Sequence, residues 1–243
     1  MTGAGAPEPR KDGGEDRGGL LEDTLGFNLR SLRTLVDLWV RPRRVMETIA
    51  ARDRDSYTPP VRLFLALIGL QVAISFVWGG YGGILERSLA EIPEEQAETF
   101  AMVIGDDPQA FFSTYGNIAA VLHAPIVGLF TALSVFVLGR FGARRPFAVN
   151  LNLIFAALTA GSVVGIAFTG FLFAGSNPPT WSVFAITAAY FITLARGLPE
   201  DVARTGAGRV IKAAVIALTM LVLVMIGAAV MQAVAIIAAA MLA

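Results

Sequence analysis

A single histidine is the one side chain that titrates near neutral pH inside the long apolar stretches of this 243-residue chain. His123 is followed two positions later by Pro125, and a proline within a helix removes a backbone hydrogen bond and can expose a carbonyl. Ionisable groups in a bilayer cost about 2.5 to 3.5 kcal/mol on the insertion scale, so they often mark functional positions. His123 and Pro125 could therefore form a proton-linked or ligand-contacting point at a kinked helix. The alternative is a neutral imidazole hydrogen-bonded to a neighbouring helix.

The chain has few other side chains that could carry out catalysis or bind a metal within the membrane. The chain has no cysteine, no second histidine and no acidic residue within an apolar stretch, so a catalytic dyad or a transition-metal site in the membrane is not expected. The carboxylates at 91, 94, 95 and 98 fall on one face of a predicted helix, which would either bind a hard cation or be solvated. A net charge of +0 disfavours nucleic-acid binding. We expect no enzyme activity, no cofactor and no metal.

The composition indicates a membrane protein. Hydrophobic residues make up 55% of the chain and charged residues 16%, below the roughly 25% usual in soluble domains. A membrane span needs about 20 apolar residues. Five charge-free windows come close to or exceed this length and predict an all-α polytopic membrane domain over residues 61–243, with about five spans. The windows cover residues 63–78, 117–138, 147–174, 179–195 and 213–243, of which the fourth is the weakest.

The distribution of Lys and Arg predicts the orientation. Of 19 basic residues, 18 fall in residues 1–62, 140–145 and 196–212, and the remaining one, Arg87, lies in an acidic segment spanning residues 82–115. Basic loops stay in the cytoplasm, so five spans place the N-terminus in the cytoplasm and the C-terminus outside. If residues 181–195 lay flat instead, the basic segment after them would be outside. The excess of Arg over Lys, with abundant Ala and Gly, favours a bacterial inner (plasma) membrane.

The N-terminal part is expected to lie in the cytoplasm. Residues 1–26 are rich in Gly, Pro and charge and predict a disordered tail. Residues 27–60 predict two amphipathic helices, the first with an apolar face and the second beginning at Pro42. The apolar face comprises Leu29, Leu32, Val36, Trp39 and Val40. Residues 41–62 carry six arginines and three acidic residues, so the pair would attract anionic headgroups at the membrane surface; a docking surface for a cytoplasmic protein is the alternative.

Polar and small residues mark the third window. Asn150 and Asn152 lie near its start on nearly opposite faces of a helix, so at least one is expected to face protein. Gly161 and Gly165 form a GxxxG spacing that lets another helix approach closely. Packing within the chain is the favoured use of this spacing, and homodimerisation is the alternative.

A juxtamembrane motif precedes the first window, and its residues are Arg41, Pro42, Tyr57, Pro59, Pro60 and Arg62. With its surroundings, over roughly residues 31–71, it resembles an uncharacterised family of bacterial inner-membrane proteins, known only as a domain of unknown function and loosely similar in layout to the small YIP-type membrane proteins. The stretch RRPFAVNLNLIFAAL is similar to the start of a later span in that family. Asn150 and Asn152 stand there where histidines are usual, and the N-terminal zinc-ribbon cysteines of many members are absent. The resemblance implies a topology and a location, without an activity.

Together these features predict a non-enzymatic scaffold or accessory subunit. Its expected partners are the lipid bilayer with anionic headgroups and either a membrane protein or further copies of the chain. A small transporter or channel, with His123 and Pro125 in a broken span, is the alternative.

Overall fold

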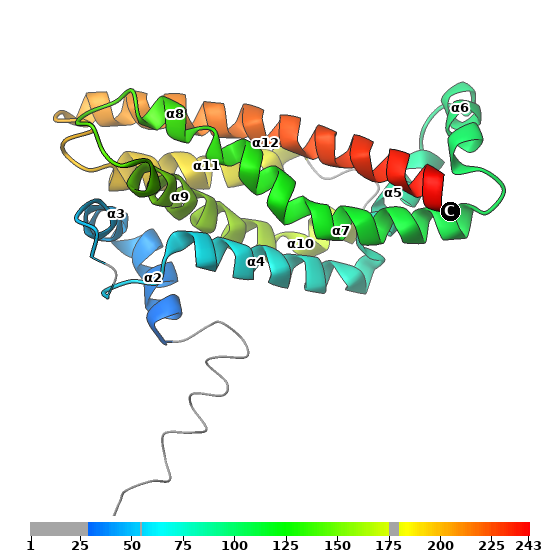
Figure 1. Ribbon diagram of the computed structural model, residues 1–243, viewed down its shortest axis with the longest axis horizontal. Coiled ribbons are helices and arrows are strands. Elements are labelled where there is room, and N and C mark those ends of the chain that lie inside the picture. Colours follow the sequence, from blue (N-terminus) through cyan, green and yellow to red (C-terminus); the bar gives the residue numbers. More distant parts are fainter. Residues whose placement is uncertain (1–28, 54, 175–179) are drawn as a thin grey trace, which may run out of the picture.

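The computed structural model describes residues 29–53, 55–174 and 180–243, and the regular structure in these residues is helical throughout (Figure 1). The predicted disordered tail, residues 1–26, lies outside the described residues. Four stretches are long and apolar enough to cross a membrane. They are Pro60–Trp78, Pro108–Leu138, Phe147–Ala167 and Gly206–Leu242.

These stretches are built from the longest helices of the chain. The first joins α4 (Pro60–Ser75) to the short 3₁₀ helix η1 (Phe76–Trp78), and the second joins α7 (Pro108–Ala132) to α8 (Val135–Leu138). The third and fourth are α9 (Phe147–Ala167) and α12 (Gly206–Leu242). The predicted fourth span corresponds to α11 (Thr180–Gly197), which is apolar but shorter than the other four.

Several helices begin before the charge-free windows that predicted them. The helix predicted from residue 117 starts at Pro108, where the Asp107 carboxylate accepts a hydrogen bond from the Ala110 amide at 2.9 Å. Residues 108–115, predicted as the last part of the outside segment, are therefore the first turns of α7. The helix predicted from residue 213 starts at Gly206, capped by Thr205. Capping residues and first turns are polar, so a search for apolar residues passes over them.

The window 147–174 is long enough either for one tilted helix or for a break near its glycines, and the structure shows the break. Helix α9 ends at Ala167 and α10 (Thr169–Ala174) follows. The span carrying Pro125 is not broken there: α7 continues through Pro125 and ends at Ala132, before the turn that leads to α8. Figure 1 shows α7 changing direction along its length, as a helix does at an internal proline.

The helix α9 occupies the centre of the bundle. Its residues from Leu153 to Ser162 are all buried, and it packs against α4 and α11. A long seam between α7 and α12 lies beside it, and α5 (Gly80–Ala90) packs on α7. In Figure 1 the long helices run along the longest axis of the molecule.

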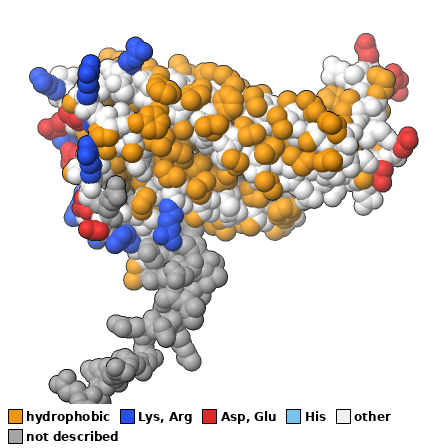
Figure 2. Space-filling model, viewed as in Figure 1, with side chains coloured by type: hydrophobic (Ala, Val, Ile, Leu, Met, Phe, Trp, Pro, Cys, Tyr) orange, Lys and Arg blue, Asp and Glu red, His pale blue; other side chains and the backbone are white. Residues whose placement is uncertain are grey.

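Shorter helices lie at the two ends of this axis. At one end are α2 (Leu29–Val40) and α3 (Pro42–Ala50), over the residues predicted to form the amphipathic pair. At the other end are α5 and α6 (Glu94–Ile104). Figure 2 shows Lys and Arg side chains at the α2 end, acidic side chains at both ends, and a mostly hydrophobic surface between them. A charged surface at each end of an apolar waist is the pattern of a protein that crosses a bilayer.

Candidate functional site

The histidine predicted as a functional group lies between α7 and α5. The His123 ring has its centroid 5.4 Å from that of Tyr81, which in turn contacts Phe173 edge to face. The Nδ1 atom of His123 is buried and has no hydrogen-bond partner in the part of the chain that the structure describes. The predicted hydrogen bond to a neighbouring helix is thus not made by this nitrogen.

Pro125 does not join His123 in one site. Side chains two positions apart in a helix point in directions about 200° apart around the helix axis. The Pro125 side chain is exposed on the outer surface of α7. The two residues therefore supply a half-buried imidazole on one side of α7 and an exposed proline on another.

The two asparagines at the start of α9 lie in different surroundings. Asn150 is buried, and its Oδ1 atom has no partner among the described residues. The Nδ2 atom of Asn152 donates to the carbonyl of Ala148 at 2.8 Å. Asn152 also lines a pocket, which connects it to the juxtamembrane motif.

Tyr57 of the motif fastens the segment after α3 onto α2. Its hydroxyl donates to Oδ2 of Asp37 at 2.8 Å, and the guanidinium of Arg33 lies 5.6 Å from the centre of its ring. Burial and the bond to the Asp37 carboxylate raise the pKa of Tyr57 above its usual value. The next residue adds a backbone bond, from the Thr58 amide to Oγ1 of Thr34 at 3.0 Å.

The prolines of the motif start helices. Pro42 is the first residue of α3 and Pro60 the first of α4, positions where the missing amide is not needed and the fixed φ favours a helix. Pro59 is the residue that precedes α4. Arg41 and Arg62 are exposed. The motif thus fixes where the two helices begin and leaves its arginines on the surface.

A pocket of about 510 Å³ brings the motif and Asn152 together. Its lining comes from the segment after α3 and from the starts of α4 and α9, and it includes Arg52, Asp53, Tyr57, Thr58, Pro59, Pro60 and Asn152. Arg52 has a φ of 61°, in the left-handed region that side chains other than glycine rarely adopt. This meeting of two distant segments could not be predicted, because spacing along the chain does not say which segments become neighbours.

Polar contacts hold α2 and α3 to the bundle. Arg196, at the end of α11, donates to the carbonyls of Trp39 and Val40, which are the last ones of α2, at 3.0 and 3.1 Å. A cation at the C-terminus of a helix satisfies unpaired carbonyls and complements the helix dipole. Arg43 of α3 bridges Glu47 and Glu200, and both partners are exposed.

The glycine pair of α9 contacts two helices of the same chain. A Cβ on Gly161 would overlap the ring of Tyr190 from α11, whereas a Cβ on Gly165 would lie 3.4 Å from the amide of Gln71 on α4. Both glycines therefore serve packing within the chain. A second close approach, between Gly82 of α5 and Gly116 of α7, was not predicted, since neither residue belongs to a spaced motif.

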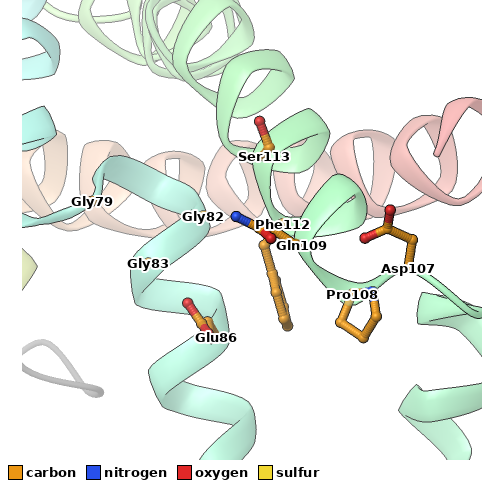
Figure 3. Close-up of a pocket in the computed structure, with 9 residues that line it drawn as sticks. All are labelled: Gly79, Gly82, Gly83, Glu86, Asp107, Pro108, Gln109, Phe112 and Ser113. Carbon is orange, nitrogen blue, oxygen red and sulfur yellow. The ribbon is translucent and has the colours of Figure 1, made fainter.

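The opposite end of the molecule carries an acidic pocket of about 710 Å³. Figure 3 shows the side chains of Glu86 from α5 and of Asp107 and Phe112 from the start of α7 around it. The Asp107 carboxylate also caps α7, and nearby Arg87 donates to the carbonyls of Trp78 and Phe173.

The predicted row of four carboxylates is wrong in one member. Glu91 follows the end of α5, whereas Glu94, Glu95 and Glu98 belong to α6, which begins after Pro93. A proline at this point separates the two helices, so the four do not share one face. Among the described residues no group of three or more His, Cys, Asp or Glu side chains is placed to hold a metal ion.

No family model, curated protein or solved structure matches this chain.

Proposed function

We propose that this chain is a non-catalytic scaffold or accessory subunit of the bacterial inner membrane. The observation that carries the proposal is the packing of α9, which is buried on all its faces over ten consecutive residues, 153–162. A helix at the centre of the bundle fills the place where a transported solute would pass. The pockets described above lie at the two ends of the bundle, away from this centre.

The proposed topology has five spans, with the N-terminus in the cytoplasm and the C-terminus outside. An 18-residue helix such as α11 is about 27 Å long, close to the thickness of the hydrocarbon core. It lies along α9 and α12, and its last turn carries Arg196. The basic side chains at the α2 end in Figure 2 support a cytoplasmic location of that end.

The proposed partner-binding surface is α6, at the acidic end. No residue of this 11-residue helix is buried, and the Met102 side chain is 80% exposed. Helices of this length are marginal without tertiary packing, so a surface that covers α6 would stabilise it. Glu94, Glu95 and Glu98 favour a partner with basic side chains around an apolar contact.

The test is cross-linking in native membranes followed by capture of the full chain, with two variants compared. Met102→Asp changes α6, and Met241→Asp changes a side chain of equal exposure, 79%, at the same end of the molecule. We expect a protein recovered in fixed ratio with the wild type and with Met241→Asp, and several-fold less of it with Met102→Asp. Recovery of the chain without a partner in fixed ratio would contradict the proposal.

A small transporter is the second candidate, and the unpaired Nδ1 of His123 is the observation that favours it. A buried ring nitrogen without a partner can accept a proton or a hydrogen bond from a ligand. The proposal and this alternative differ in one measurable property, which is flux across a reconstituted membrane.

A further inference from the structure

We propose that α2 lies in the plane of the membrane and inserts one face into the leaflet at the basic end, among anionic phospholipids. This face, the outer face of α2, consists of Leu29, Leu32, Val36 and Val40. The inference assigns a lipid-binding surface and does not depend on the scaffold function.

In a helix on the surface of a water-soluble protein, the apolar side chains are buried and the polar ones are exposed. In α2 this arrangement is largely reversed. The side turned to the protein buries Ser31 and Thr34 together with Leu38. The outer face is exposed by 82% at Leu29, 58% at Leu32, 51% at Val36 and 58% at Val40. Four large apolar side chains on one exposed face are unfavourable in water and favourable in a hydrocarbon layer.

Hydrogen bonds fix this rotation of α2. The hydroxyls of Ser31 and Thr58 lie 3.2 Å apart, and the Thr58 amide donates to Thr34. The Tyr57 hydroxyl holds Asp37 on the adjacent flank. Turning the outer face inward would break these bonds and leave the amide of the buried Thr58 without its acceptor, which costs more than the bond itself contributes.

The position of α2 places its outer face beside lipid. In Figure 1, α2 runs across the direction of the long helices, at the end of the bundle, and extends past α4. Exposed side chains of α4, Leu65 and Leu70, continue the apolar surface into the waist of the molecule. A helix that lies across the long helices at the end of the bundle runs parallel to the membrane plane, as interfacial helices do.

Charge favours an anionic leaflet over a second copy of the chain. Arg30 and Arg33 lie on the flank of α2 beside the outer face, and Arg62 is exposed at the start of α4. Anionic headgroups attract such side chains, whereas two copies meeting through α2 would bring like charges together. The occupant that fits both the apolar face and the charges is a phospholipid layer containing phosphatidylglycerol or a similar lipid.

The experiment uses spin labels, because a chain without cysteine takes one label at one introduced Cys. The full chain carries the label at Val36→Cys, on the outer face, or at Arg33→Cys, on the polar flank. Both proteins are reconstituted in nanodiscs of phosphatidylcholine with phosphatidylglycerol. We expect the label at position 36 to collide more with oxygen than with a water-soluble nickel chelate, and the label at position 33 to show the reverse.

Three results would overturn the inference. Equal access of the nickel chelate to both labels would place the outer face in water. Exclusion of both reagents at position 36 would mean that protein covers it, and dipolar broadening between labels would identify a second copy of the chain. The anionic preference is tested in nanodiscs of phosphatidylcholine alone, where nickel access at position 36 should rise at least twofold; unchanged access would remove that part of the inference.

Discussion

At the residue scale, the hydroxyl of Tyr57 is the contact on which the arrangement of α2 depends most directly. It joins two segments 20 positions apart in the chain, and it does so beside a guanidinium that covers the same ring. The sequence marked Tyr57 as part of a motif. It could not mark Asp37 as its partner, because the turn after α3 that brings them together is not encoded in any spacing.

Tyr57→Phe should loosen α2 without unfolding the bundle. Loss of the bond leaves the Asp37 carboxylate with one donor fewer, at a cost of about 1 kcal/mol. Amide hydrogen exchange in α2 should become roughly fivefold faster, with no change in α9. Equal exchange in both proteins would show that this bond does not hold α2.

The same contact should weaken in alkali. The pKa of Tyr57 is raised on folding, so the protonated hydroxyl is favoured in the folded state and its contribution is complete below the ordinary pKa of about 10. The contribution is lost as the pH rises above that value towards the folded pKa. Hydrogen exchange in α2 should therefore accelerate above pH of about 10 in the wild type more than in Tyr57→Phe. An identical rise in both would assign the effect to other groups.

His123→Ala separates the two candidate functions. On the scaffold account, proteoliposomes containing the wild type, His123→Ala or Pro125→Ala all show the same proton and ion leakage as empty liposomes. A pH-dependent flux that the wild type and Pro125→Ala support and His123→Ala abolishes would instead establish the transporter.

At the element scale, the sequence predicted where the helices lie along the chain. It did not predict which side of each helix packs against the protein. The ranges of α2 and α3 follow from apolar periodicity and from Pro42, which must begin a helix rather than continue one. The periodicity of α2 shows an apolar side but does not say whether that side faces protein or lipid. Here Ser31 and Thr34 take the protein side because Thr58 offers them partners.

The glycines of α9 give a matched pair of substitutions. Gly161→Ala forces a methyl group into the Tyr190 ring and should destabilise the packing of α9 on α11 by about 1 to 3 kcal/mol. Gly165→Ala places its methyl group at an ordinary distance from Gln71 and should change stability far less. Thermal unfolding in detergent measures both. If neither substitution affects unfolding but Gly161→Ala dissociates a dimer, the spacing serves homodimerisation.

At the scale of the whole molecule, the location of the C-terminus decides between five spans and four. With α11 crossing the membrane, a Cys at Ala243 lies outside and a Cys at Arg204 lies in the cytoplasm. A membrane-impermeant maleimide applied to cells with a permeable outer membrane should then label the first position and spare the second. The reverse pattern would mean that α11 does not cross and that α12 runs in the other direction.

We propose that the chain works as one subunit of a larger assembly. The most direct measurement is the mass of the complex released from native membranes in mild detergent, by native mass spectrometry. We predict a species that contains the 25.7 kDa chain together with a different protein in an integer ratio. A species containing only this chain, as one copy or several, would contradict the claim.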